Sequence, residues 1–465
     1  MLVRPVILSG GQGSRLWPLS LKNRPKQFLT FNGESSFFKQ TLVRVSNQKI
    51  FKSPIIICNE NQKFLVQDHC DAIGLSEYKI VVEPLSKNTG PAVIAGILSA
   101  NEKDEKFLIL PSDHHIDSVD AFEDCIVSAF PVCRDSLVIF GVKPDKPSTA
   151  YGYIKRSDTK SYSGYYVEKF IEKPDRKKAN LFFTDNSYLW NSGMLLGNKS
   201  LIIEQFKKFR PEMLSQVSKA VKLSIKDLDF TKLNSEAYES CINESIDYAL
   251  LENSQSTVVV PAKFKWNDIG SWSSIYDFFL KKDKNKNVLI GKSLALNTKN
   301  SLIYSNNKTI ATYGVEDLMI VEGPNAFLVA NINNSEDVKK VVNSLNFEDL
   351  EQQIEIYRPW GHYEVIDSGP FHQVKRLVVK EDGRLSLQSH KYRSEHWVVV
   401  EGEGRVIKGN DTVNLKKGES IFIPAGVKHS LINLLPKKLV VIEVQSGSYL
   451  GEDDIKRFED IYGRK

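Results

Sequence analysis

The sequence contains no apolar run of the roughly 18–20 residues that a membrane-spanning helix needs. Its five cysteines form no close Cys-x-x-Cys pair, which excludes a disulfide framework and favours a reducing compartment. The 62 basic residues nearly balance the 57 acidic ones, so no basic excess indicates nucleic-acid binding. The first residues also lack the apolar core and cleavage site of a signal peptide. Together these absences predict a cytoplasmic protein with neither nucleic-acid nor membrane partners.

With 465 residues, of which 41% are apolar, the chain is long enough for two to four globular domains. Short apolar runs alternate with helical patterns up to about residue 277, which predicts a mostly parallel sheet covered by helices. The predicted strands are Val3–Leu8, Ile55–Cys58, Phe107–Leu110, Leu137–Val142 and Met194–Gly197. A buried helix is predicted from Gly90 to Ala100, with Asn88-Thr89 as its cap.

A lysine-rich stretch at residues 281–286 marks a change in composition. Beyond it, short β-like segments at 301–304 and 318–321 predict a small all-β connector, followed by a helix over 335–345. From about residue 357 strands dominate again, at 374–379, 397–400, 420–423 and 439–444, and the turns between them predict a β-barrel or double sheet. The resulting domains are 1–280, 287–345 and 350–465.

The sequence SGGQGSRLWPLS at residues 9–20 follows the first predicted strand. Three glycines at the end of a strand let backbone N–H groups approach a phosphate without side-chain interference. Arg15 and Lys26 add positive charge beside this loop. Glycine-rich turns are common, so the loop alone leaves a purely structural turn open.

The motif continues as RPKQF at residues 24–28, and the whole string resembles the sugar-nucleotide pyrophosphorylases, within them the mannose-1-phosphate guanylyltransferases. Further segments match that family in order: EPLSKNTGPA at 83–92, PSDH at 111–114, VEKFIEKP at 167–174, WNSGM at 190–194 and WNDIGSW at 266–272. The sequence departs from the family pattern at Lys87 and Gly90. The resemblance implies a Rossmann-like nucleotidyltransferase domain within an α/β fold.

Nucleotidyl transfer requires cations and backbone donors around the departing pyrophosphate, a requirement that Gly11, Gly13, Arg15 and Lys26 meet. Asp113 and Asp268 are the natural carboxylates for Mg²⁺. From the residues alone, Asp113 is also readable as a helix cap and Asp268 as a turn residue. The resemblance favours the metal roles.

The resemblance alone implies further roles. It places Gly10 at the nucleotide together with Gly11 and Gly13, and it assigns base binding to Asn88, Thr89 and Gly90. The sugar phosphate is assigned to Gly152, Glu172, Lys173 and Asn191. Without the resemblance, Lys173 would be interpreted as a surface residue.

Residues 383–402 and 418–433 resemble the two motifs of the cupins, with Gln388 where many cupins have their first histidine. Alternate residues Gln388 and His390 point to one face of a strand, and Glu395 and His429 can reach it from neighbouring strands. Such a set of nitrogen and oxygen ligands suits Zn²⁺, Co²⁺, Mn²⁺ or Fe²⁺. Taken singly, His429 would be an ordinary loop histidine.

A cupin behind a guanylyltransferase resembles the bifunctional type II phosphomannose isomerases. The resemblance implies GDP-mannose synthesis from GTP and mannose 1-phosphate, and interconversion of mannose 6-phosphate and fructose 6-phosphate, two hexose 6-phosphates, in the C-terminal cupin β-barrel. Arg393 is expected to bind the phosphate or polarise the substrate. Lys391 and Tyr392 stand where many members have histidine, so a non-catalytic cupin that binds sugar or dimerises is the alternative. A homo-oligomer is compatible with either interpretation, and a non-enzymatic nucleotide-sugar sensor is the third hypothesis.

Overall fold

The computed structural model describes residues 2–11, 13–31, 35–102, 105–254, 256–345 and 355–462. The chain divides into two compact units, Met1–Glu322 with Leu328–Val342, and Gly323–Phe327 with Asn343–Lys465. None of the helices in the described ranges is both long and apolar enough to cross a membrane.

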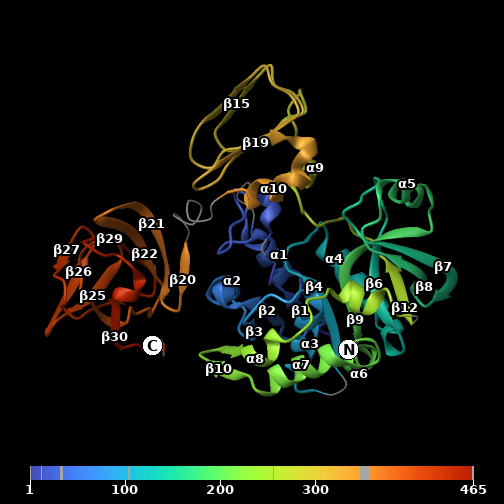
Figure 1. Cartoon of the computed structure of the whole chain (residues 1–465), viewed down its shortest axis with the longest axis horizontal. Coiled ribbons are helices and arrows are strands. Elements are labelled where there is room, and N and C mark those ends of the chain that lie inside the picture. The colour runs from blue at the N-terminus through green and yellow to red at the C-terminus, as the bar shows by residue number, and fades with distance from the viewer. Residues whose placement is uncertain are drawn as a thin grey trace. The chain divides into compact units, whose positions relative to one another are not determined.

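An 11-stranded mixed sheet is the framework of the first unit (Figure 1). The strand order is β10-β11-β3-β2-β1-β4-β9-β6-β12-β8-β7. The strands are β1 (Arg4–Leu8), β2 (Ile55–Asn59), β3 (Lys79–Glu83), β4 (Lys106–Pro111), β6 (Leu137–Val142), β7 (Tyr153–Ser161), β8 (Gly164–Ile171), β9 (Tyr188–Asn198), β10 (Ile225–Asp227), β11 (Phe230–Lys232) and β12 (Thr257–Pro261). The five predicted strands coincide with β1, β2, β4, β6 and part of β9, whereas β3 and β12 were not predicted.

The sheet is parallel only in part. β11, β3, β2, β1 and β4 run parallel, as expected, but β9 runs antiparallel between β4 and β6. β7 and β8 are also antiparallel, because only two residues connect them and a parallel crossover needs a much longer connection. The prediction of a mostly parallel sheet is therefore wrong for β7, β8 and β9, whereas β6 and β12 do pair in parallel.

Helices pack on the sheet, and α3 lies closest to the site described below. The helices of this part are α1 (Phe37–Arg44), α2 (Lys63–Asp71), α3 (Thr89–Leu98), α4 (Val119–Ala129), α5 (Arg176–Thr184), α6 (Lys199–Phe209), α7 (Pro211–Lys222), α8 (Ser235–Glu239) and α9 (Trp272–Phe278). The Asn88 side chain accepts a hydrogen bond from the Thr89 N–H, which confirms the predicted cap. A Cβ at Gly96 would lie 2.6 Å from Val6 Cγ1, so this glycine lets α3 pack directly on β1.

The connector winds as a parallel β coil that packs with the first unit. Its strands are β14 (Val288–Ile290), β15 (Ser293–Leu296), β16 (Leu302–Tyr304), β17 (Ile310–Tyr313), β18 (Leu318–Glu322) and β19 (Phe327–Asn331). β14, β16 and β18 pair in parallel, as do β15 and β17. The turn η6 (Ile332–Asp337) and helix α10 (Val338–Asn343) follow, so the predicted helix begins later than expected.

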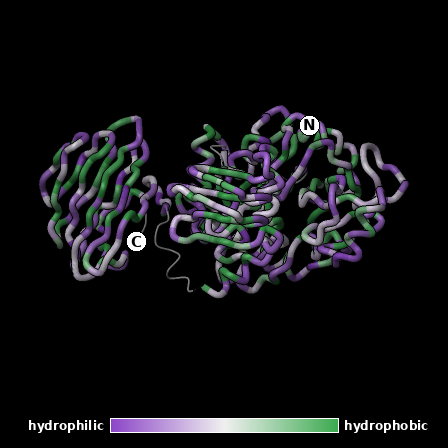
Figure 2. Tube along the Cα trace, turned by 90° about the horizontal axis from the view of Figure 1, so that it is seen from above, coloured by the Kyte–Doolittle hydropathy of each residue, from purple (hydrophilic) through white to green (hydrophobic). Residues whose placement is uncertain are grey.

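Two sheets enclose the core of the second unit. The six-stranded sheet contains β20 (Ile356–Arg358), β21 (Gly361–Gly369), β22 (His372–Val379), β29 (Leu439–Gly447), β24 (Arg393–Glu401) and β27 (Ser420–Ile423). The five-stranded sheet contains β26 (Asp411–Lys416), β25 (Glu403–Lys408), β28 (His429–Asn433), β23 (Leu387–His390) and β30 (Ile455–Glu459). Figure 2 shows apolar and hydrophilic segments intermixed along the chain of this unit. Along β24, buried residues alternate with less buried ones, as expected when one face of a strand packs on a core. The predicted cupin β-barrel is confirmed.

Candidate active sites

A cavity of about 540 Å³ opens where β1, β3 and β4 end at their carboxyl ends. Ligands in open α/β sheets bind at this edge. Gly10 and Gly11 line the cavity after β1, Glu83 lines it at the end of β3, and Asp113 lines it after β4. The predicted nucleotide loop and the predicted metal carboxylate thus belong to one cavity.

The glycine loop is held in an open conformation by its neighbours. Gly13 has a φ of +61°, and a Cβ there would lie 2.5 Å from Lys26 Cβ. The side-chain amide of Gln27 donates to the carbonyl oxygens of Ser9 (3.0 Å) and Gly11 (3.3 Å). These bonds fix the backbone of the loop, and a Cβ at Gly11, which lines the cavity, would meet no atom within 4 Å.

Lys26 is buried and links the Asp113 carboxylate to the backbone of the Asp268 turn. Its Nζ lies 2.8 Å from Asp113 Oδ2 and also donates to the backbone oxygen of Asp268. Burial raises the pKa of Asp113, but the charges of Lys26 and His114 outweigh it and hold that pKa below its usual value. The carboxylate is therefore ionised and already faces a cation.

Asp113 and Asp268 differ in whether their side chains support the local backbone. Asp113 caps no helix, because α4 is capped by Ser118, whose side chain accepts from the Ala121 N–H. Asp268 Oδ1 accepts from the Tyr151 hydroxyl (2.9 Å) and from the Gly270 N–H (3.1 Å), so it does brace a turn. The same turn places its backbone oxygen against Lys26.

Arg15 does not join Lys26. Its guanidinium forms an ion pair with Glu336 of η6 at 2.8 Å, and Arg15 is absent from the residues that line the cavity. Both side chains are substantially exposed, at 40% and 54%. The sequence motif could not reveal this partner, which lies 321 residues away.

The residues predicted to contact the base lie at the start of α3. Asn88 and Thr89 line the cavity, whereas the Gly90 N–H donates to the Glu244 carbonyl, and a Cβ at Gly90 would lie 2.7 Å from that oxygen. Glu83, which the sequence reasoning did not select, also lines the cavity. Burial raises its pKa to about 7, even though the Tyr238 hydroxyl donates to it. Its place at the end of a buried apolar strand was the signal that could have identified it.

The predicted sugar residues form a connected group. The Asn191 N–H donates to the Gly152 carbonyl at 2.8 Å, and a Cβ at Gly152 would lie 2.6 Å from Glu172 Oε2. Lys173 is largely exposed and forms an ion pair with Glu172. Asp247, also missed from sequence, accepts from the Asn191 side chain at 3.0 Å and lines the cavity.

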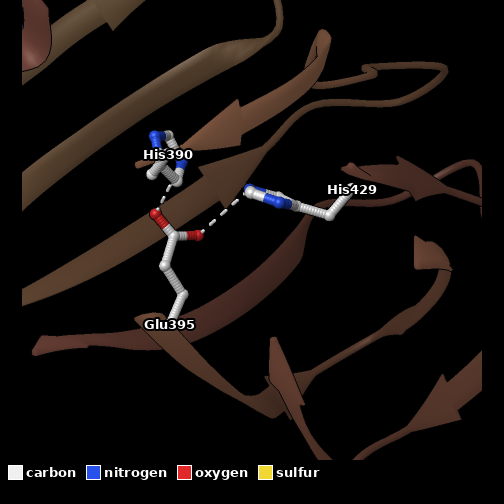
Figure 3. A group of neighbouring side chains, drawn as sticks. All are labelled: His390, Glu395 and His429. Carbon is white, nitrogen blue, oxygen red and sulfur yellow. Dashed lines mark ion pairs between the residues drawn. The ribbon is translucent and has the colours of Figure 1, made fainter. Parts of the chain in front are cut away.

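In the second unit, His390, Glu395 and His429 come together inside the barrel. Figure 3 shows the Glu395 carboxylate between the two imidazoles. Glu395 Oε1 lies 3.0 Å from His390 Nε2, and Oε2 lies 3.4 Å from His429 Nε2. One ligand atom from each residue lies within 4.8 Å of the others, and all three side chains are 1% exposed.

The three side chains of this group shift one another's pKa values. Burial raises the pKa of Glu395, but its bonds to both histidines bring that pKa well below the usual value. Burial lowers the pKa of His390, whereas Glu395 outweighs burial at His429 and raises its pKa. His429 Nδ1 lies 2.9 Å from the Val427 carbonyl oxygen, a bond that turns Nε2 toward Glu395.

The remaining two predicted cupin residues are engaged by the protein. Gln388 is paired in register with His429, and its side-chain oxygen accepts from the Ser386 hydroxyl at 2.9 Å. Arg393 is buried and donates to the carbonyl oxygens of Leu450 (3.2 Å) and Gly451 (2.8 Å). Both residues line a small cavity that Glu395 also lines.

Comparison with known proteins accounts for nearly the whole chain. The family described as nucleotidyl transferase matches residues 4–285, a MannoseP isomerase/GMP-like beta-helix domain matches 291–345, and a mannose-6-phosphate isomerase C-terminal domain matches 346–460. The alginate biosynthesis protein AlgA of Pseudomonas aeruginosa is 42% identical over 99% of this chain and 97% of its own length. The mannose-1-phosphate guanylyltransferase of Escherichia coli K12 is 40% identical over 99% of this chain and 98% of its own. The chain belongs to the bifunctional mannose-1-phosphate guanylyltransferase/mannose-6-phosphate isomerase family.

Solved structures resemble parts of this guanylyltransferase-family chain. A structure described as mannose-1-phosphate geranyltransferase from Thermus thermophilus covers 74% of this chain and 98% of its own, with a TM-score of 0.65 and 26% identity. A mannose-6-phosphate isomerase from Helicobacter pylori covers 57% of this chain and 100% of its own, with a TM-score of 0.50 and 28% identity.

Proposed function

We propose that the first unit transfers guanylate from GTP to mannose 1-phosphate, which gives GDP-mannose and pyrophosphate. The observation that carries this proposal is the Lys26 ammonium group, buried between Asp113 and Asp268 beside the bare glycine loop. This arrangement presents a fixed cation and backbone donors to a triphosphate, which in-line transfer requires.

Mg²⁺ fits the two carboxylates. Asp113 is ionised, and the same lysine holds the backbone oxygen of Asp268, so this ammonium group links the segments that carry the two hard oxygen donors. When bound, Mg²⁺ neutralises phosphate charge as the pyrophosphate leaves. Lys26 holds both carboxylate segments in place, while Gly10, Gly11 and Gly13 let the phosphates approach the backbone.

The base end of the cavity supports guanine. Asn88, Thr89 and Gly90 set the start of α3 there, and Glu83 presents a buried carboxyl group at the end of the neighbouring strand. The Watson–Crick edge of guanine offers two adjacent N–H donors, which a carboxylate accepts. Gly152, Glu172, Lys173 and Asn191 are assigned to the sugar phosphate on the other side of the metal carboxylates.

In the cupin we propose that His390, Glu395 and His429, with Gln388, hold Zn²⁺, Co²⁺, Mn²⁺ or Fe²⁺. His390 Nδ1 is buried without a hydrogen bond, and His390 Nε2 and His429 Nε2 face the Glu395 carboxylate, an arrangement of nitrogen and oxygen donors that fits such a cation. A cation held there would supply Lewis-acid chemistry for an aldose–ketose conversion between mannose 6-phosphate and fructose 6-phosphate. Arg393 then orients the loop at residues 450–451 and contributes positive charge to the cavity. The cytoplasmic location and a homo-oligomeric state stay predictions.

A pyrophosphate-release screen tests the transferase. The full chain with Mg²⁺ is mixed with each of four nucleoside triphosphates and with several hexose 1-phosphates, and we expect release with GTP and mannose 1-phosphate. Release with glucose 1-phosphate alone contradicts the assignment to mannose, and no release with any pair favours a sensor.

A separate assay tests the cupin. The full chain, loaded in turn with each transition metal, is given mannose 6-phosphate, and fructose 6-phosphate is measured. If no metal supports turnover, the cupin is a sugar-binding or dimerising module. Lys391 and Tyr392, which stand where many family members have histidine, would then be the first residues to replace by histidine.

A further inference from the structure

The sugar end of the transferase cavity contains a carboxylate without an assigned role. Asp247 lines the cavity, whereas Glu172 and Asn191 are absent from its lining. It is the first residue of η5 (Asp247–Leu251), a π-helical turn, and such turns are often found at functional sites. The chain thus brings a partly buried acid to the cavity wall at a local irregularity.

The contacts of Asn191 show which of the two side chains is available to a ligand. One N–H of its amide donates to Asp247 Oδ1 at 3.0 Å, and its oxygen accepts from the Gly193 N–H at 3.1 Å. Both ends of the amide therefore serve the protein. A carboxylate has about four acceptor positions, and that of Asp247 accepts from Asn191, from the Ser245 side chain and from its own backbone N–H, so it keeps capacity for about one further donor.

The surroundings of Asp247 resemble those of a group that waits for hydroxyl donors. Burial raises its pKa to about 6, and the nearby charge of Glu172 adds to this. Lys173 opposes the shift without forming an ion pair with Asp247, because its ammonium group pairs with Glu172. Neutral hydrogen-bond donors, such as sugar hydroxyls, satisfy such a carboxylate.

The segment that bonds to Asp247 lies next to the strand that Asp113 follows. β9, which carries Asn191 and Gly193, is the direct neighbour of β4, which Asp113 follows, and adjacent strands are roughly 5 Å apart. A Cβ at Gly193 would lie 3.3 Å from Pro111 Cγ, so the two segments touch. Asp113 and Asp247 therefore line one cavity, with the Gly193 segment of β9 beside the end of β4.

We propose that Asp247 is a specificity residue that accepts a hydrogen bond from the 2-hydroxyl of the hexose 1-phosphate. This inference rests on the proposed transferase function and names the group that distinguishes the sugar. Asn191 is a positioning residue for Asp247, and it also ties η5 to β9.

The test compares full-length wild-type protein with Asp247→Asn and Asp247→Glu. We expect Asp247→Asn to lower kcat/KM for mannose 1-phosphate by about 10- to 100-fold, the range for one hydrogen bond to a charged group, with the KM for GTP changed by less than about twofold. Wild type should lose a similar factor with the 2-deoxy sugar phosphate, whereas Asp247→Asn should use both sugars equally within about threefold.

Glu244→Gln is the matched control, because Glu244 precedes the same turn and pairs with Arg210 without lining the cavity. It should lower the thermal midpoint without changing the preference for the 2-hydroxyl. The proposal is overturned if Asp247→Asn keeps the wild-type preference, or if both Asp247 variants impair GTP and sugar equally.

Titration calorimetry with mannose 1-phosphate separates this inference from the proposed function. If wild type releases no pyrophosphate but binds the sugar phosphate with an affinity that falls in Asp247→Asn, the transferase proposal fails and this one stands. If wild type turns over but its affinity for sugar is independent of Asp247, only this inference fails.

Discussion

The two sites neutralise their central carboxylates in different ways. In the first unit, Asp113 faces the ammonium group of Lys26, a cation that belongs to the chain. In the barrel, Glu395 faces two imidazoles that are themselves metal ligands in our proposal, and Arg393 Nε lies 3.5 Å from Glu395 Oε1. A lysine thus faces the transferase carboxylate, whereas the cupin carboxylate is shared between an arginine and imidazoles whose protons a metal must replace. We expect the first site to take Mg²⁺ with its substrate and the second to hold its metal permanently.

The largest expected effect separates the two activities. Asp113→Ala removes the carboxylate that faces Lys26, and pyrophosphate release should fall by about a thousandfold, since electrostatic stabilisation of the transferred phosphate is lost. Initial rates with GTP and mannose 1-phosphate measure this. Isomerisation of mannose 6-phosphate by the same variant is the internal control, and an equal loss of both activities would show that the variant is misfolded.

The second effect concerns the transition metal that we expect the cupin site to retain through dialysis. His429→Ala should reduce bound transition metal from one per chain to near zero and lower isomerisation by at least about a hundredfold, because a ligand rather than a supporting residue is removed. Elemental analysis of the dialysed protein measures the metal. His362→Ala, at a histidine in β21 outside the His390–Glu395–His429 group, is the matched control. Full metal content in His429→Ala would overturn the assignment of the ligands.

The third effect tests a carboxyl group that faces no cation. Glu83 has a pKa of about 7 in the folded chain against 4.5 ordinarily, so its contribution to stability is complete below pH 4.5 and is lost as the pH rises through 7. Relative to wild type, Glu83→Gln should gain about 2 kcal/mol in free energy of unfolding between pH 5 and pH 8. Urea denaturation at both pH values measures the difference. Identical pH dependence in the two proteins would show that the pKa of Glu83 is not raised.

The smallest effect involves the exposed pair between Arg15 and Glu336. Exposed ion pairs contribute about 0.2–1 kcal/mol, so Glu336→Gln should free Arg15 for the triphosphate and lower the KM for GTP by at most about fivefold. Asp337→Asn, which breaks the neighbouring pair with Lys340, is the control and should leave KM unchanged. A higher KM in Glu336→Gln would mean that the pair orders the loop for binding.

Much of both sites could be predicted because the relevant residues are close in sequence to a strand end or to one another. The glycine loop directly follows β1, Asp113 directly follows β4, and His390 and Glu395 flank the turn between β23 and β24. In each case one of two local patterns predicts where the side chain lies. Side chains alternate between the two faces of a strand, and the end of an apolar run marks the carboxyl end of a strand. The antiparallel insertion of β9 was not predictable in this way, because no local pattern records which strand becomes its neighbour.

The sequence by itself determined the domain types, the buried strands and the chemistry of the motifs, since periodicity and local spacing depend only on neighbouring residues. Only the tertiary structure decided that Arg15 pairs with Glu336, that Glu83 joins the cavity, and that Asp247 receives the amide of Asn191. These contacts join residues up to 321 positions apart. They arise from the packing of separate elements, which brings charges together at distances and degrees of burial that no single segment encodes.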